Sequence, residues 1–191
     1  MFETLAAQPA DALLALIGLY RDDPRPGKLD LGVGVYRDET GATPIMAAVK
    51  RAEEILLATR TTKSYLGPEG DLVFVDLLKP IAFGADPGPR LTGVQTPGGS
   101  GALRLAAELI AAAKPRARVL VGQPTWPNHA PILTSAGLTV VPHPFFDVAR
   151  QTIDFAAVKA AIAAAGPGDV ALLHGCCHHP AGADLDEAQW E

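Results

Sequence analysis

The sequence has few cysteines and no long hydrophobic run, and both absences narrow the class of protein. Its two cysteines, Cys176 and Cys177, are neighbours in the chain. Adjacent cysteines rarely form a disulfide with each other, so a fold held together by disulfides is excluded. The apolar stretch at 12–20 is too short to span a bilayer, and the N-terminus lacks the basic segment of a signal peptide. We therefore expect a protein of the reducing cytoplasm.

Charge of either sign is also sparse. Charged residues make up 19% of the 191 residues and hydrophobic residues 48%, a balance that favours a packed core over disorder. The net charge is −5 and the basic residues are scattered, so no surface that follows nucleic-acid phosphates is expected. The length suits one domain, or one and a fraction. The last segment, 184–191, resembles the opening of a helix, which favours an incomplete domain.

Apolar residues recur at helical spacing in some segments and form short continuous runs in others. Helices are expected at 11–20, 44–60, 71–83, 101–113, 127–135 and from Asp154 onward, and strands at 91–95, 119–121, 138–141 and 170–173. Pro80 lies inside one of these helices and is expected to kink or end it. The alternation predicts an α/β fold with a mostly parallel sheet and flanking helices. Its strands end on one edge, where ligands usually bind.

A glycine-rich loop at 96–101, Thr-Pro-Gly-Gly-Ser-Gly, leads directly into one of the expected helices. The first N–H groups of a helix lack intrahelical partners, and together with the helix dipole they bind phosphate. Glycines let a ligand approach the backbone, and Ser100 adds a hydroxyl donor. The spacing matches neither the dinucleotide fingerprint nor the P-loop. Taken alone, the loop is explained equally well as a phosphate site or as a turn.

Two further segments directly follow expected strands. The first, 124–129, contains Trp126, whose ring can stack on a flat ligand, although a core tryptophan beside a turn explains it equally well. The second, 174–180, reads His-Gly-Cys-Cys-His-His-Pro. Cysteine and histidine both bind zinc, but consecutive ligands in one turn cannot all face one ion, and structural zinc sites use wider spacing. A metal site is therefore disfavoured, and no metal ligand is expected.

The order of five segments resembles the aspartate and aromatic amino-acid aminotransferases, class I enzymes that use pyridoxal 5′-phosphate. These segments lie at 31–39, 63–67, 96–103, 126–129 and 174–178. The resemblance covers nearly the whole chain but only the N-terminal half of such a protein. It implies the large domain of the type I pyridoxal-phosphate-dependent transferase fold, incomplete here. It divides the chain into an N-terminal arm at 1–10, a small-domain segment at 11–43 and the N-terminal part of the cofactor-binding large domain at 44–191.

The resemblance also implies roles for residues of the cofactor site. Gly98, Gly99 and Ser100 would bind the cofactor phosphate, and Ser100 stands where the family usually has threonine. Trp126 would stack on the pyridine ring and touch the substrate carboxylate. His129 would not touch the cofactor itself but would support the residues beside its ring.

Three more residues are implicated by the same resemblance. The backbone of Gly34 would lie against the substrate carboxylate, and Tyr65 would reach the phosphate of the other subunit's cofactor, which implies a homodimer with shared sites. His179 stands where the family has an asparagine that donates a hydrogen bond to the ring oxygen of the cofactor. Histidine is larger and its tautomer is not fixed, so we expect His179 to bind the cofactor with weaker alignment.

The catalytic groups of the family have no counterpart in these 191 residues. A transaminase needs a lysine for the Schiff base, an aspartate at the pyridine nitrogen and an arginine for the substrate carboxylate. None of the six lysines stands in the family position, so no catalytic residue is expected in this chain.

The full reaction would move an amino group from an L-amino acid, aspartate or aromatic, to a 2-oxo acid, and this chain alone is expected to be a truncated, inactive form. A non-catalytic remnant or partner-dependent fragment is the alternative, and a metal-binding module ranks last.

Overall fold

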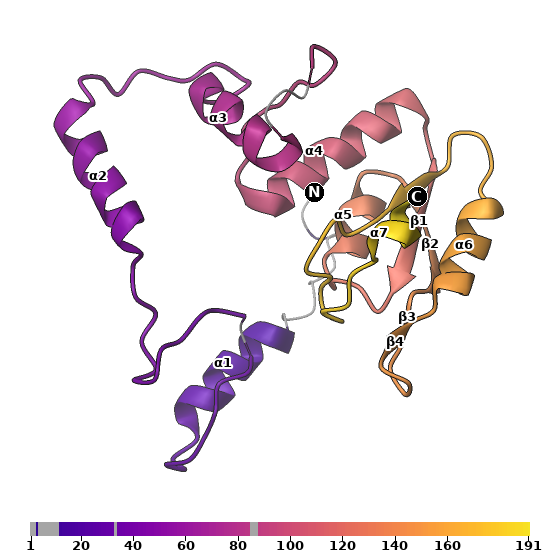
Figure 1. Cartoon of the computed structure of the whole chain (residues 1–191), viewed down its shortest axis with the longest axis horizontal. Coiled ribbons are helices and arrows are strands. Elements are labelled where there is room, and N and C mark those ends of the chain that lie inside the picture. Colours follow the sequence, from indigo (N-terminus) through magenta and orange to yellow (C-terminus); the bar gives the residue numbers. More distant parts are fainter. Residues whose placement is uncertain (1–2, 4–11, 33, 85–87) are drawn as a thin grey trace. The chain divides into compact units, whose positions relative to one another are not determined.

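The computed structural model describes residue 3 and residues 12–32, 34–84 and 88–191 (Figure 1). These residues form two compact units, Met1–Ser64 and Tyr65–Glu191, each described here by itself. The expected N-terminal arm at 1–10, apart from Glu3, and the expected cap at Asp11 lie outside the described residues. The domain boundary expected between 43 and 44 stays a prediction. Within the described ranges, no helix is long and apolar enough to cross a membrane.

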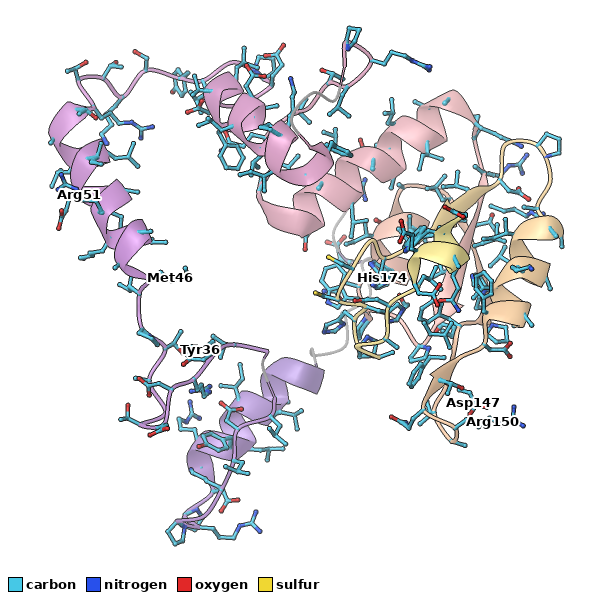
Figure 2. All side chains as sticks on the ribbon, in the orientation of Figure 1. Tyr36, Met46, Arg51, Asp147, Arg150 and His174 are labelled. Atoms are coloured by element: carbon cyan, nitrogen blue, oxygen red, sulfur yellow. The ribbon has the colours of Figure 1, made fainter. Side chains whose placement is uncertain are left out.

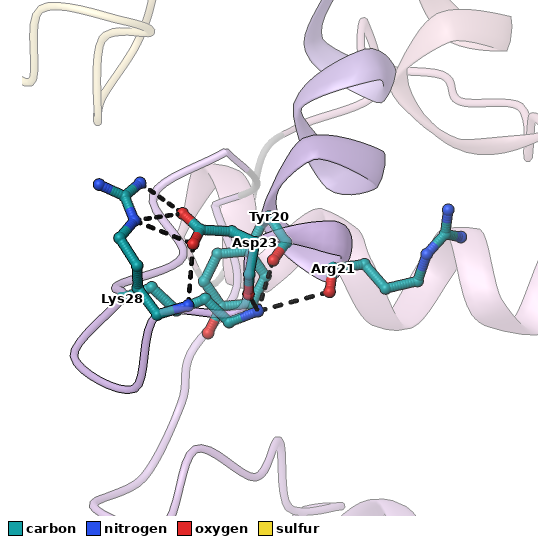
Figure 3. A network of polar contacts seen from close by, with 5 residues as sticks. Tyr20, Arg21, Asp23 and Lys28 are labelled. Atoms are coloured by element: carbon teal, nitrogen blue, oxygen red, sulfur yellow. Dashed lines mark hydrogen bonds and ion pairs between the residues drawn. The ribbon is translucent and has the colours of Figure 1, made fainter.

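The first unit holds two helices, α1 (Ala12–Asp22) and α2 (Ala47–Thr59). Beyond the end of α1, the Lys28 ammonium donates to the main-chain carbonyls of Tyr20 (2.6 Å) and Asp23 (2.7 Å), as Figure 3 shows. The last carbonyls of a helix lack intrahelical donors. Lys28 therefore supplies both hydrogen bonds and a positive charge where the helix dipole is negative.

The second helix begins at Ala47 rather than at Pro44, where the sequence predicts its start. The Thr43 hydroxyl donates to the carbonyl of Tyr36 (2.9 Å), and this bond holds 43–44 in the preceding loop. The N-cap residue of α2, Met46, makes no side-chain capping bond.

The second unit is built on a three-stranded parallel sheet in the order β2-β1-β5. Its strands are β1 (Arg118–Gln123), β2 (Thr139–Pro144) and β5 (Val170–Leu172). In the register of the central strand, Val119 pairs with Val140 on one side and with Val170 on the other. Because parallel sheets are covered on both faces, their strands are continuous apolar runs. The expected parallel α/β sheet is confirmed.

Helices cover both faces of this sheet. α4 (Gly98–Ala113) and α5 (His129–Ser135) lie on one side, and α6 (Phe155–Ala163) lies on the other (Figure 1). The core under α4 and α5 consists of Ala107, Ala117, Val119, Val121, Leu133 and Leu138. On the other side, Val158 of α6 is only 1% exposed. Burying an aliphatic side chain of this size stabilises a fold by about 1.5–3 kcal/mol. The core therefore stabilises the sheet, and with it the positions of the strand ends.

The expected strand at 91–95 is wrong, and so is the alternative in which Pro80 ends its helix; the alternative in which Pro80 kinks the helix stays a prediction. Residues 91–95 form no strand, because no second strand pairs with them among the described residues; the N–H of Gln95 instead donates to the carbonyl of Glu69 (2.8 Å). Pro80 does not end its helix, since α3 (Leu72–Phe83) continues past it. Proline removes one backbone donor, and here that donor lies in the last turn, where the helix is about to end.

A short hairpin of β3 (Phe146–Asp147) and β4 (Thr152–Ile153) is absent from the sequence-based expectations. Asp147 accepts hydrogen bonds from the N–H groups of Ala149 (2.9 Å) and Arg150 (3.0 Å) at its turn. Figure 2 shows Asp147 and Arg150 at the tip of this hairpin. Strands of two residues are too short to produce a recognisable alternation of polar and apolar residues.

Aspartates begin three of the helices in this unit. Asp71 caps α3, and the expected cap at Asp154 is confirmed, because its carboxylate accepts from the N–H of Ala157 (3.0 Å). Asp186 caps the short last helix, α7 (Glu187–Trp190), through a capping box. An aspartate at this position satisfies helix N–H groups that would otherwise lack partners.

Candidate cofactor site

The glycine-rich loop forms the start of α4, which begins at Gly98 rather than at 101. The Gly98 N–H donates to the Thr96 carbonyl (2.8 Å), and the Thr96 hydroxyl donates to the Gly98 carbonyl (3.0 Å). Gly98 has a φ of 64°, a left-handed conformation that favours glycine. The helix therefore starts from a tight turn that a residue with a side chain would not readily adopt.

The next two N–H groups, those of Gly99 and Ser100, have no hydrogen-bond partner within the part of the chain that the structure describes. A Cβ built on Gly98 or Gly99 would meet no atom within 4 Å, so open space lies beside the loop. The N-cap residue, Pro97, makes no side-chain capping bond that would occupy these donors. Free N–H groups at the positive end of a helix favour an anion.

Gln95 ties this loop to the segment that follows Tyr65. Its backbone N–H donates to the carbonyl of Glu69, and its side-chain oxygen accepts from the N–H of Asp71, both at 2.8 Å. Gly70 lies so close that a Cβ there would sit 2.4 Å from the Cβ of Gln95. Tyr65 itself is fully exposed. Sequence reasoning missed Gln95, because its bonds join residues that are distant in the chain.

Thr125, Trp126 and His129 form a compact group at the carboxyl end of β1. The Thr125 hydroxyl lies 2.7 Å from Nδ1 of His129. The Trp126 ring meets the His129 ring edge-on, with centroids 5.3 Å apart and an interplanar angle of 84°. His129 is buried and Trp126 is partly buried. The structure thus places His129 against Trp126, and the supporting role expected for it stays a prediction.

A second group of rings lies at the carboxyl end of β5, the neighbour of β1. His178 stacks on Phe145 (4.2 Å between centroids) and on His174 (4.0 Å). His174 meets His129 edge-on at 5.3 Å, and its Nε2 lies 3.4 Å from the Thr125 hydroxyl. We call these five residues the histidine cluster; His174 marks it in Figure 2. The parallel sheet therefore brings together two of the segments that the sequence singles out.

The three imidazoles of the cluster are mainly neutral at neutral pH. Burial lowers the pKa of His129, and the charges of His174 and His179 lower it further. Burial also lowers the pKa of His174, with His179 acting in the same direction and Asp184 opposing. The pKa of His178 is lowered mainly by burial as well. A neutral imidazole has one donor and one acceptor nitrogen, so each ring of the cluster can take part in a directed chain of hydrogen bonds.

The donors and acceptors of this series of hydrogen bonds depend on which ring nitrogens carry protons. Nδ1 of His174 accepts from the backbone N–H of His179 (3.2 Å), so the proton of neutral His174 sits on Nε2 and faces Thr125. The Thr125 hydroxyl can then donate to Nδ1 of His129, a direction that requires the tautomer of His129 with its proton on Nε2. In that tautomer, the Nε2 proton of His129 is available to a further acceptor.

The turn at 177–182 carries His178 and His179. Asp184 closes it, because its two carboxylate oxygens accept from the N–H groups of Cys177 and His178, each at 2.9 Å. The Gly182 N–H donates to the carbonyl of His178 (2.7 Å). The two bonds to the backbone lower the pKa of Asp184 below its usual range. The side chain of His179 is exposed beside the cluster rather than part of its stack.

The cysteines of this turn, Cys176 and Cys177, are free thiols at the surface. Within the described residues, no group of three or more histidine, cysteine, aspartate or glutamate side chains could hold a metal ion. Two histidines of the segment, His174 and His178, instead stack on each other.

Some expected site residues cannot be related to this cluster. Gly34 belongs to the unit Met1–Ser64, and a Cβ built there would meet no atom within 4 Å. Its expected contact with a substrate stays a prediction, as do the roles expected for Tyr65 and His179. Phe145 and Asp184 were missed in the sequence, because each acts through a contact that exists only once the chain is folded.

The known proteins that this chain resembles are aminotransferases. The profile of the family described as aminotransferase class I and II matches residues 26–191. The tyrosine aminotransferase of Rhizobium meliloti (strain 1021) is 57% identical over 192 residues, and the aspartate aminotransferase of Escherichia coli (strain K12) is 46% identical over 195 residues; all of this chain and 49% of each relative are covered.

A solved structure, the aromatic-amino-acid aminotransferase of Burkholderia pseudomallei covalently bound to pyridoxal phosphate, superposes with a TM-score of 0.93 at 34% identity, over 100% of this chain and 49% of that one. The chain thus spans about half the length of the curated relatives it matches. It belongs to the class I and II aminotransferase family.

Proposed function

We propose that this chain holds the cofactor-binding part of an aminotransferase that moves an amino group from an L-amino acid to a 2-oxo acid by means of pyridoxal 5′-phosphate. The observation that carries the proposal is the histidine cluster beside Trp126, at the ends of two adjacent parallel strands. Such a sheet edge is where α/β folds bind their ligands. The names of the relatives, tyrosine and aspartate aminotransferase, support this reaction class and leave both substrate types open.

The residues of the glycine-rich loop fit a phosphate group. The free N–H groups of Gly99 and Ser100 would bind it at the start of α4, and the Ser100 hydroxyl would add a third donor. The open space beside Gly98 and Gly99 lets a bulky anion approach the backbone. Hydrogen bonds to an anion are stronger than those between neutral groups, so this end of the cofactor would contribute much of the affinity.

The residues at the sheet edge fit the pyridine ring. Trp126 offers a flat apolar face for stacking, and a neutral His129 protonated on Nε2 would have that proton to donate. His179 would take the place of the family's asparagine beside the ring oxygen. When bound, the cofactor would supply an electron sink for the bonds at the α-carbon of the amino acid. The chain's own residues would orient the ring and keep water from its buried side.

The remaining roles concern substrate and partner. Gly34 would meet the substrate carboxylate through its backbone, and Tyr65, exposed in this structure, would reach the cofactor phosphate of a second subunit. We therefore propose a homodimer with shared sites. No catalytic residue is assigned within these 191 residues, because none of the six lysines stands in the family position for the Schiff base.

The test is a charge placed in the proposed phosphate site. Gly99→Asp introduces a carboxylate where an added Cβ meets no atom within 4 Å, so the fold should tolerate it. We expect affinity for pyridoxal 5′-phosphate to fall about tenfold or more, because the carboxylate repels the phosphate and occupies its donors. Pyridoxal, which lacks the phosphate, should bind equally to both chains. Quenching of Trp126 emission measures binding in a Trp190→Phe background, where Trp126 is the remaining tryptophan.

Gly27→Asp is the matched control, because it adds the same charge at a loop glycine with equally open surroundings. It should bind the cofactor as the unmodified chain does. Equal losses for pyridoxal 5′-phosphate and pyridoxal, or equal behaviour of the two aspartate variants, would show that the loop does not hold the phosphate.

A further inference from the structure

One carboxylate holds the turn that carries two histidines of the candidate site. We propose that Asp184 is a positioning residue, which closes the turn at 177–182 and thereby fixes the stacked rings of His174 and His178. This inference rests on the proposed function only in taking these rings to line a cofactor site. The contacts that support it lie entirely within the unit Tyr65–Glu191.

Each carboxylate oxygen of Asp184 has its own donor. Oδ2 accepts from the N–H of Cys177 and Oδ1 from the N–H of His178, both at 2.9 Å. Bonds to an ionised acceptor are stronger than those between neutral groups. Cys177 has a φ of 51°, a left-handed conformation that is unfavourable for any residue except glycine. The two bonds thus hold the backbone in a conformation that it would otherwise leave.

The turn also holds the imidazole rings in their positions. His178 is 5% exposed and lies between Phe145 and His174, at 4.2 and 4.0 Å. Its Nδ1 accepts from the N–H of Ala181 (3.4 Å), so the ring is held by the turn to which it belongs. The N–H of His179 donates to Nδ1 of His174 and selects the tautomer of that ring. If the turn moves, His174 loses both its stacking partner and its donor.

The charge of Asp184 also reaches the two rings. It opposes the effect of burial and raises the pKa of both His174 and His178. The effect of the position of Asp184 and the effect of its charge can be separated by substitution. Asp184→Asn removes the charge and one of the two acceptors, whereas Asp184→Glu keeps the charge and both acceptors but displaces them by one methylene.

The experiment follows backbone hydrogen exchange and imidazole resonances of the 191-residue chain by NMR. In Asp184→Asn we expect the N–H groups of Cys177 and His178 to exchange about tenfold faster or more, since one of them loses its acceptor. The ring resonances of His174 and His178 should move, and both rings should titrate at lower pH. Unchanged exchange at Val119, in the centre of the sheet, would show that the fold is intact.

Asp147→Asn is the matched control. Asp147 holds a turn in the same way, by accepting from the N–H groups of Ala149 (2.9 Å) and Arg150 (3.0 Å), but it does so in the β3–β4 hairpin. This variant should speed exchange there and leave the imidazole resonances in place. If Asp184→Asn also loses protection at Val119, Asp184→Glu decides: displaced rings in a folded chain support positioning, and unmoved rings contradict it.

Titration with pyridoxal 5′-phosphate connects the turn to the site. We expect Asp184→Asn to bind it about tenfold more weakly, while Asp147→Asn binds it as the unmodified chain does. If Asp184→Asn keeps its ring resonances, or if the rings move and the affinity does not, the inference is wrong. If the unmodified chain binds no cofactor, the proposed function fails, and the exchange and ring measurements alone decide whether Asp184 positions the turn.

Discussion

The Thr125 hydroxyl connects two imidazoles that come from different strand ends, 2.7 Å from Nδ1 of His129 and 3.4 Å from Nε2 of His174. Thr125→Val keeps the shape of the side chain but removes the hydroxyl, so buried His129 loses a partner. We expect the free energy of unfolding to fall by about 1–3 kcal/mol, measured by urea denaturation at neutral pH. Thr125→Ser, which keeps the hydroxyl, should lose much less. Equal losses for valine and serine would attribute the effect to methyl packing instead.

The titration of the clustered histidines predicts how stability depends on pH. Folding lowers the pKa of His129, His174 and His178 from an ordinary value of 6.5, mainly through burial. Below that value the unfolded chain binds more protons than the folded one, so the stabilisation is complete above it and is lost as the pH falls. We expect the free energy of unfolding to decrease between neutral pH and about pH 5.5.

The control for this prediction uses two asparagine variants. His129→Asn should reduce the dependence on pH, whereas His143→Asn, whose ring makes none of the described ring contacts, should preserve it. Carboxylates act in a lower range, since the pKa of Asp169 is lowered to about 2, chiefly by its hydrogen bond from Arg118. Stability that stayed constant or increased toward pH 5.5 would contradict the assignment of neutral, buried imidazoles.

At the scale of elements, Lys28 predicts the stability of α1. Its ammonium donates to carbonyls at the end of that helix and lies 4.5 Å from the centre of the Tyr20 ring. Lys28→Met keeps most of the apolar stem but removes the donor and the charge, which should cost about 0.5–1 kcal/mol and speed hydrogen exchange in the last turn of α1. Lys50→Met removes an exposed ion pair with Glu53 in α2 and serves as the control. Equal exchange in both variants would mean that Lys28 does not cap the helix.

The elements that the sequence predicts well are those with a local pattern. β1 and its flanking helices follow from continuous apolar runs and helical spacing, because both depend on burial of neighbouring residues. The segment at 91–95 has the same apolar character but finds no partner strand among the described residues, and no local pattern reports that. The hairpin at 146–153 is missed for the opposite reason, since its strands are too short to show a pattern.

The residues of the candidate site also fall into two groups: those found from the sequence and those found only in the structure. Trp126 and His174 are found from the sequence because each directly follows a strand, and parallel strands end on one edge. Their neighbours Gln95, Phe145 and Asp184 are not found, because they act through bonds and stacking between separate segments. A single sequence shows which residue types lie near the edge, but the contacts that orient them depend on the folded chain.

At the scale of the whole molecule, we predict that the 191-residue chain alone does not transaminate. Five of its six lysines already have partners: Lys28 with carbonyls, Lys50 with Glu53, Lys79 with Asp76, Lys114 with the Pro167 carbonyl and Lys159 over the Phe155 ring. Without a lysine at the site, the chain lacks the group that takes and returns the proton at the substrate carbon. Aspartate and 2-oxoglutarate should give no glutamate above background. Turnover equal to that of a full-length aspartate aminotransferase would overturn the assignment.

Gln95 bonds twice to the segment at 65–71 and directly precedes the loop at 96–101, so the sequences of the two segments depend on each other. Gln95, which precedes the loop, bonds to Glu69 through its backbone N–H and to Asp71 through its side chain, and a side chain at position 70 would clash with it. Substitutions in residues that share a partner do not add. During evolution, a change in either segment would therefore alter which changes the other tolerates, and the two would diverge together rather than independently.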